Sequence, residues 1–182
     1  MLRSHSKPYG TIAREDYIGA MRGVASSVTV VTTDGPAGRH GATVSAFSSV
    51  SADPPTMLVC LRGGSRIAEA VARNGAFCIN VLPQSQDAIA DRFAGRHDTK
   101  VSDRFEGIDC HGASGTGPVL KDATAFSCRI EQTVASGSHI IVIGHVVRIE
   151  TGAPDPLAYL DGAYHRVAPH NAVPFTQRTD AA

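Results

Sequence analysis

The stretch from Val28 to Arg62 constrains the fold more than any other part of this 182-residue chain. It contains three segments rich in β-branched and apolar residues, separated by the turn-forming runs Asp34-Gly35-Pro36 and Asp53-Pro54-Pro55. This pattern predicts a hairpin from residues 27–33 into a strand over 41–51, and then a third strand. In the middle segment hydroxyl residues nearly alternate with apolar ones. Such a strand can face the core on one side and hold polar groups on the other.

The rest of the chain indicates a mainly β protein with flanking helices. Apolar residues at helical spacing predict three helices, over residues 15–24, 66–73 and 86–93. β-rich segments predict further strands over 77–82, 123–134, 140–149, 157–160 and 164–167. The polar, glycine-rich chain between residues 96 and 117 predicts a long surface loop. Six or seven strands with short turns favour an antiparallel barrel or sandwich over a βαβ array.

Composition limits the class of partner. Hydrophobic residues make up 42% of the chain, and 17 basic residues balance 17 acidic ones, so we expect neither a nucleic-acid nor a membrane partner. The four cysteines lack the spacing of metal ligands, which favours reduced cysteines that pack in the core. The first residues lack the apolar segment of a signal peptide, and we expect a cytoplasmic protein. One domain over residues 15–168, with a loose arm (1–14) and tail (169–182), fits this length.

Several motifs, in their order along the chain, resemble the short-chain flavin reductase family. The run from Thr32 to Pro55 has the pattern T-T-D-G-x-x-G-x-x-G-x-T-V-S-A-F-S-S-V-S-x-x-P-P. Further similar motifs are FCINVL at 77–82, DRFAG at 91–95, DRFEGIDCHGASGTGPVL at 103–120, SGSHIIVIGHVV at 136–147 and GAYHRV at 162–167. The resemblance implies the antiparallel, Greek-key FMN-binding split β-barrel. It also implies a homodimer that binds flavin near the subunit interface.

The same resemblance implies an NAD(P)H:flavin oxidoreductase, the reductase component of a two-component monooxygenase system. Such an enzyme transfers a hydride from NADH or NADPH to FMN or FAD, and reduced flavin then diffuses to a separate flavin-dependent monooxygenase. Two alternatives stay open. The chain could be a flavin-binding accessory protein of the same fold without reductase activity, or a flavoprotein that reduces another acceptor such as a corrin or haem.

A flavin needs donors for the polar edge of its ring, an apolar slot, and partners for its phosphate. The resemblance places the isoalloxazine ring along the strand that carries Thr43, Val44, Ser45 and Ala46. From the residues alone, these hydroxyls could equally be strand formers on an exposed face. The resemblance also assigns cofactor contacts to Thr32, Cys60, Leu61, Asn80 and Tyr164. Asn80 could instead satisfy backbone groups, and Tyr164 could instead pack against a partner subunit.

For the flavin phosphate, the candidates are Ser48, Ser49, Arg62, Ser65 and Arg66. Ser65 precedes a predicted helix, whose first N–H groups can bind an anion, and an arginine can add paired hydrogen bonds. Relatives commonly read L-N-R-S-S here, whereas residues 61–65 of this chain read L-R-G-G-S. Arg62 therefore either takes over the anion contact or is a solvated strand end.

His139 is the candidate catalytic residue on the nicotinamide side. Relatives commonly read G-D-H at this hairpin turn, and this chain reads Gly137-Ser138-His139. Serine removes a carboxylate that could orient the imidazole, and a surface role for the histidine stays open. Hydride transfer depends on positioning two stacked rings and needs no general base, so we predict neither a nucleophile nor a metal site.

Overall fold

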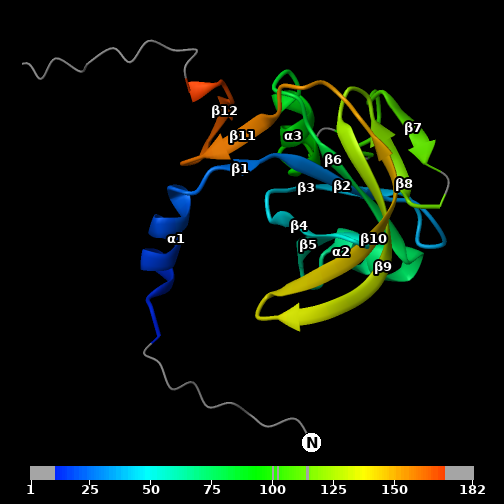
Figure 1. Ribbon diagram of the computed structural model, residues 1–182, viewed down its shortest axis with the longest axis horizontal. Coiled ribbons are helices and arrows are strands. Elements are labelled where there is room, and N and C mark those ends of the chain that lie inside the picture. The colour runs from blue at the N-terminus through cyan, green and yellow to red at the C-terminus, as the bar shows by residue number, and fades with distance from the viewer. Residues whose placement is uncertain (1–10, 100, 102, 114, 171–182) are drawn as a thin grey trace, which may run out of the picture.

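The computed structural model describes residues 11–99, 101, 103–113 and 115–170 (Figure 1). Most of the predicted arm, and the tail beyond residue 170, lie outside the described residues. The elements are α1 (Arg14–Arg22), β1 (Ser26–Ser27), β2 (Thr29–Thr33), β3 (His40–Val44), β4 (Phe47–Ala52), β5 (Pro55–Arg62), α2 (Arg66–Asn74), β6 (Ala76–Val81), α3 (Asp87–Phe93), β7 (Cys110–Ala113), β8 (Gly117–Leu120), β9 (Thr124–Ser136), β10 (His139–Glu150), β11 (Leu157–Leu160) and β12 (Ala163–Arg166). Within the described chain, no helix has the length and apolar character needed to cross a membrane.

One antiparallel sheet of seven strands dominates the fold, in the order β3-β2-β6-β9-β10-β5-β4. Its edge strands β3 and β4 are consecutive in the chain, and only Ser45 and Ala46 connect them. Because two residues span only a few ångströms, the sheet must curl until its edges approach each other. Where they approach, the Cys60 amide N donates a hydrogen bond of 2.8 Å to the Ala46 carbonyl. In Figure 1, β4 continues from β3 and runs beside β5.

The prediction of one strand over residues 41–51 is therefore wrong. The chain forms two strands here, and they pair with different partners: β3 pairs with β2, and β4 pairs with β5. The chain changes partner at Ser45 and Ala46, where the alternation of hydroxyl and apolar residues is interrupted by the adjacent apolar residues Ala46 and Phe47. A period-two pattern does not report which strand lies alongside, and a single irregularity of this kind also occurs within one strand, so it does not by itself mark a corner.

A further difference concerns the segment between α3 and β8. The predicted loop over 96–117 contains β7, which pairs with β8 as a two-stranded sheet. Strands of four residues that include glycines show too few alternations to be seen in the sequence. The predicted hairpins are confirmed: β9 pairs with β10, and β11 pairs with β12. β1 joins the latter pair to make a three-stranded sheet.

Helix α2 begins and ends where the sequence predicts. The Ser65 Oγ accepts a hydrogen bond of 3.3 Å from the Ala68 amide N, which caps the start of the helix. Gly75 ends it in the left-handed conformation, with φ of 71°. Ile67, Ala68, Ala70 and Val71 are its buried face. Because the apolar face packs against the seven-stranded sheet, the N-terminal end of α2 is fixed next to β3.

The core has two main clusters, one on each side of the strand pair β2 and β6. The first contains Val59, Phe77 and Ile79, and the second contains Phe93 and Leu120. A buried polar network lies among them. The Asn80 Oδ1 accepts a hydrogen bond from the Leu120 amide N (2.9 Å), and the Asn80 Nδ2 donates to the Val30 (3.1 Å) and Pro118 (3.3 Å) carbonyls. The core is thus built from apolar packing and one satisfied amide.

The four cysteines are free thiols, as predicted. Cys78 and Cys128 are buried, and burial raises the pKa of each thiol to about 12. Cys60 and Cys110 are half-buried. Because a raised pKa keeps a thiol protonated and unreactive, Cys78 and Cys128 act as small apolar side chains.

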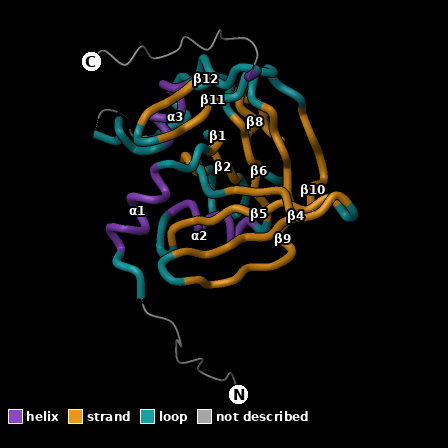
Figure 2. Tube along the Cα trace, turned by 60° about the vertical axis from the view of Figure 1, so that its left-hand side comes forward, coloured by secondary structure: helices purple, strands orange, loops and turns teal. Residues whose placement is uncertain are grey.

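Helix α1 has no buried residues, although one side of it is apolar. Tyr17, Ile18, Met21 and Val24 are between 40% and 61% exposed. Figures 1 and 2 show α1 on the outside of the molecule, beside β1 and away from the seven-stranded sheet. An ion pair between Arg22 and Asp161 (2.7 Å) ties its end to the turn between β11 and β12.

Candidate functional site

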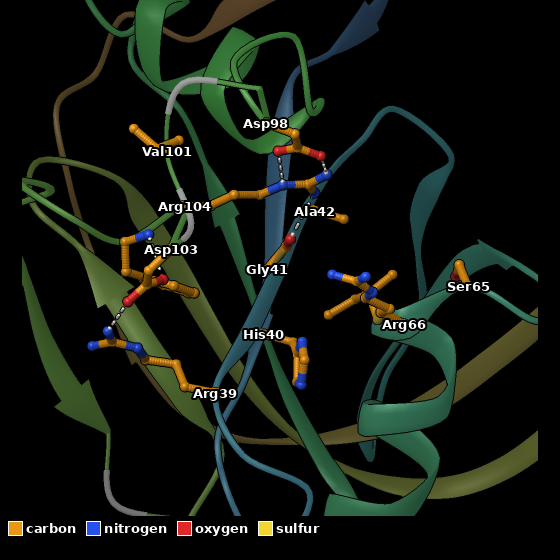
Figure 3. Close-up of a pocket in the computed structure, with 12 residues that line it drawn as sticks. Arg39, His40, Gly41, Ala42, Ser65, Arg66, Asp98, Val101, Asp103 and Arg104 are labelled. Carbon is orange, nitrogen blue, oxygen red and sulfur yellow. Dashed lines mark hydrogen bonds and ion pairs between the residues drawn. The ribbon is translucent and has the colours of Figure 1, made fainter.

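A pocket of about 830 Å³ opens between β3, the start of α2 and the loop that follows α3 (Figure 3). It is lined by Arg39, His40, Gly41, Ala42, Ser65, Arg66, Ile67, Asp98, Val101, Asp103, Arg104 and Phe105. Three guanidinium groups face two carboxylates, which leaves one positive charge in excess. The pocket is therefore suited to an anionic group.

The α2 wall of the pocket offers donors that are not used elsewhere. Arg66 and Ile67 are the first residues of the helix, where backbone N–H groups have no acceptor within the helix. The Ser65 Oγ donates to the Arg62 carbonyl (2.6 Å), which fixes the turn before the helix. Among the described residues, the Arg66 side chain forms no ion pair, and Figure 3 shows it directed into the pocket from α2. A helix N-terminus with a free arginine is a typical phosphate-binding arrangement.

The opposite wall is held by Arg104. Its Nε and Nη2 donate to the two carboxylate oxygens of Asp98, at 2.9 and 2.7 Å. Its Nη1 donates to two backbone carbonyls, those of Phe93 (2.9 Å) and Gly41 (3.2 Å). The hydrogen bond from Arg104 holds the pKa of Asp98 below its usual value against burial, the next-largest effect, and the charges of Arg104 and then Arg66 lower it further. Asp98 is therefore a carboxylate at neutral pH.

A second arginine ties the same loop to β3. The Arg39 Nη2 donates to the Asp103 Oδ2 (2.8 Å), and its guanidinium lies 4.5 Å from the centre of the Phe105 ring. The Phe105 ring packs edge-on against Phe93, with centroids 4.9 Å apart. The Phe105 amide N donates to the Asp103 Oδ1, and this bond is the largest cause that lowers the pKa of Asp103. Both carboxylates of the pocket are thus paired with arginines of the wall.

The residues predicted to contact the flavin ring continue from β3 beyond this pocket. Thr43 follows the pocket residue Ala42, and its Oγ1 donates to the Ala90 carbonyl (2.6 Å). The Val44 carbonyl accepts from the Thr29 Oγ1. Ser45, Ala46, Ser48 and Ser49 are exposed at the corner and along β4. Of the predicted cofactor residues, Ser65 and Arg66 line the pocket, and the exposed serines lie further along the segment that contains β3.

The structure brings together the predicted residues at the ends of β5 and β10. Arg62 and His139 are directly paired in the ladder, as are Cys60 and Ile141. Both Arg62 and His139 are exposed. The His139 Nδ1 lies 3.0 Å from the Ser138 Oγ, so serine provides the hydrogen-bond partner next to the ring. The Leu61 side chain points into the core and is 1% exposed.

Three predicted contacts lie elsewhere. Thr32 and Asn80 are fully buried, and their polar groups form hydrogen bonds within the core. The Thr32 Oγ1 donates to the Pro118 carbonyl (2.6 Å). The Tyr164 hydroxyl donates to the Asp91 Oδ1 (2.7 Å). Burial and then this hydrogen bond raise the pKa of Tyr164 to about 12. A cofactor role for these three stays a prediction, and their contacts within the single chain are those of structural residues.

Sequence reasoning missed Arg39, His40, Asp98 and Arg104. A signal was present, because the tripeptide Asp-Arg-Phe occurs at residues 91–93 and again at 103–105. The two phenylalanines of these repeats pack together, and the second arginine is the clamp of the pocket wall.

The family described as "Flavin reductase like domain" matches residues 21–168, nearly the whole described chain. The chain belongs to this family. The predicted family resemblance is thereby confirmed.

Among relatives in this family, an NADH-dependent FMN reductase named RutF, from Ancylobacter novellus, is 43% identical over 159 residues, which cover 86% of this chain and 87% of the relative. The solved flavin reductase PheA2 is 32% identical with a TM-score of 0.78, and the match covers 87% of this chain and all of that one. The styrene monooxygenase flavin reductase of Pseudomonas putida S12 is 28% identical with a TM-score of 0.73, and the match covers 84% of this chain and 98% of that one.

Proposed function

We propose that this chain is an NADH-dependent flavin reductase that supplies reduced FMN to a separate monooxygenase. The observation that carries the proposal is the 43% identity over 87% of a relative named as an FMN reductase that uses NADH. The similar reductase of a styrene monooxygenase supports delivery to an oxygenase partner. FAD is the second flavin to test, and NADPH the second donor.

The residues present fit a flavin mononucleotide. Arg66 and the first N–H groups of α2 would hold the phosphate, in a pocket with an excess of positive charge, while the Ser65 hydroxyl fixes the turn before them. The exposed groups from Ser45 to Ser49 would lie along the ring, with Cys60 beside them on β5. Bound flavin supplies the redox chemistry, because its N5 accepts the hydride from nicotinamide C4.

His139 and Arg62 would bind the nicotinamide nucleotide at the open ends of β10 and β5. Their pairing across the ladder supports this role, because it brings an imidazole and a guanidinium together at one end of β5 and β10. Neither has to move a proton, since hydride transfer requires only that the rings be stacked at the right distance. Their contribution is to orient the donor and to bind its phosphates.

We further propose a split β-barrel that works as a homodimer. The approach of β3 and β4 across two connecting residues supports the barrel. The exposed apolar side of α1, Tyr17 and Met21 included, supports a second copy as its partner, because an apolar helix face with no cover is costly in water. The four free thiols fit a reducing compartment such as the cytoplasm.

Steady-state oxidation of NADH, measured with and without added FMN, tests the proposal. We expect turnover that rises with free FMN, and coupling to a flavin-dependent oxygenase through diffusing reduced flavin. His139→Ala should raise KM for NADH about tenfold with a smaller effect on KM for FMN. A protein that binds FMN without turnover would point to an accessory role. NADH oxidation that depends on a corrin or haem, and not on free flavin, would point to another acceptor.

A further inference from the structure

One of the two carboxylates that line the pocket is partly exposed to solvent, where it could act on an anionic ligand. Asp98 lines the pocket, and the Asp98 side chain is 50% exposed. Arg66 lines the wall formed by α2, so Asp98 and Arg66 carry opposite charges in the same pocket, and the charge of Arg66 is the smallest of the causes that lower the pKa of Asp98. A free carboxylate here would both repel a phosphate and attract the arginine that should receive it.

Arg104 binds the Asp98 carboxylate, and its own guanidinium is held in place by the backbone. Both Asp98 oxygens accept from Arg104, at 2.9 and 2.7 Å, while the Nη1 of the same guanidinium is bound to two backbone carbonyls. One of these, Phe93 O, is at the C-terminal end of α3, and the other, Gly41 O, is on the edge strand β3. A fork geometry of this kind leaves the guanidinium little freedom to follow Asp98 if the loop moves.

The surrounding backbone is fitted to this pair. A Cβ atom added at Gly95, where φ is 85°, would lie 2.7 Å from the Arg104 Nη2 and 3.0 Å from the Asp98 Oδ2. Glycine at 95 thus leaves room for the ion pair as well as allowing the left-handed turn after α3. In Figure 3 the pair lies at the top of the pocket, apart from Arg66 on the α2 side.

We propose that Arg104 is a positioning residue that keeps Asp98 from Arg66, so that Arg66 stays available to the phosphate of the ligand. The inference rests on the proposed function for the identity of the ligand, FMN, and it adds that discrimination between phosphorylated and unphosphorylated flavin depends on a residue that touches neither. Arg104 acts through Asp98, and Arg66 makes the contact.

Equilibrium binding of FMN and of riboflavin, followed by flavin fluorescence, tests this. Riboflavin has the same ring and ribityl chain but no phosphate. In Arg104→Gln the Asp98 carboxylate is released, and we expect the affinity for FMN relative to riboflavin to fall about tenfold. In Asp98→Asn the pocket gains a positive charge, and this ratio should rise about threefold. The double variant should recover to within about threefold of the wild-type ratio, because no free acid remains.

Arg148→Gln is the matched control, since the exposed Arg148 side chain forms an ion pair with the half-buried Glu150 outside the pocket (3.1 Å). Its FMN-to-riboflavin ratio should equal that of the wild type. An equal loss of FMN and riboflavin affinity in Arg104→Gln would show that the residue merely holds the fold, and would overturn the proposal. So would a double variant that is no better than Arg104→Gln. If Arg104→Gln does not fold, Asp98→Asn decides alone, and a ratio that stays constant or falls refutes the idea.

Binding and turnover separate this inference from the proposed function. A wild-type protein that prefers FMN over riboflavin but does not oxidise NADH would contradict the reductase and leave the role of Arg104 to the variants. A protein that turns over with an unchanged FMN-to-riboflavin ratio in Arg104→Gln would contradict the role of Arg104 alone.

Discussion

Replacing Asn80 with alanine should destabilise the protein strongly while leaving flavin binding nearly intact. The side chain is fully buried and holds three segments together: the Leu120 amide N donates to its Oδ1 (2.9 Å), and its Nδ2 donates to the Val30 and Pro118 carbonyls (3.1 and 3.3 Å). Alanine leaves the buried Leu120 N–H without an acceptor, which costs about 1–3 kcal/mol. The lost Nδ2 bonds add about 1 kcal/mol, since the Pro118 carbonyl keeps its bond from the Thr32 Oγ1.

The free energy of unfolding should therefore fall by about 2–4 kcal/mol, and Tm by roughly 5–15 °C for a chain of this size. Urea titration followed by circular dichroism measures the first quantity, and an unchanged m-value shows that the denatured state is the same. Gln132→Ala, an exposed amide on β9, is the control and should stay within about 0.5 kcal/mol of wild type. The reasoning is refuted if Asn80→Ala keeps wild-type stability but binds FMN ten times more weakly, because Asn80 would then contact the ligand.

Three further predictions follow from the packing and the ionisation states. Gly41→Ala should cost about 1–3 kcal/mol of stability and raise KM for FMN, because its Cβ would lie 2.6 Å from the Phe93 ring; urea titration and steady-state kinetics check this, and wild-type stability would contradict it. Stability should decline as pH rises from about 10 to 12, because the pKa of Tyr164 is raised to about 12 and the folded state therefore holds this proton more tightly than the unfolded state. Tyr164→Phe should flatten that decline in unfolding titrations at several pH values, and an unchanged slope would count against the assignment. Met21→Glu on α1 should turn a dimer into a monomer in sedimentation experiments, whereas Glu15→Gln on the same helix should not; a dimer that survives the Met21 change would exclude this face.

The sequence predicted the elements whose signals are local. Ser65 and Gly75 bound α2 because capping needs only neighbouring residues, and the β9–β10 hairpin follows from β-rich segments around a short polar turn. The corner at Ser45 and Ala46 was missed because strand partners are chosen by tertiary contacts, and the one break in the alternation there, Ala46-Phe47, does not say which strand lies alongside.

The pocket was only partly predictable for a related reason. Ser65 was found from its place before a helix, and Arg66 was noted with it. The other wall depends on a loop 55 to 65 residues further along the chain folding back onto β3 through Arg104 and Asp103. Charged residues in a polar loop are ordinarily solvated, so nothing in their immediate surroundings distinguishes these from others. Asn80 differs, because a polar residue within an apolar strand is visible in the sequence. In the structure its side chain bonds to backbone groups, which was one of the two roles considered for it.

Because only two residues link β3 and β4, a ligand bound along the proposed flavin segment would contact both edge strands of the sheet. The link joins the first and the last strands of the seven-stranded order, and among the described residues no ladder pairs β3 with β4. The bound ligand would hold the two edge strands together and slow their separation. Amide protons on β2 and β5, which pair with these edge strands, should then exchange more slowly with solvent once FMN is added, whereas those near β7 should keep their exchange rates.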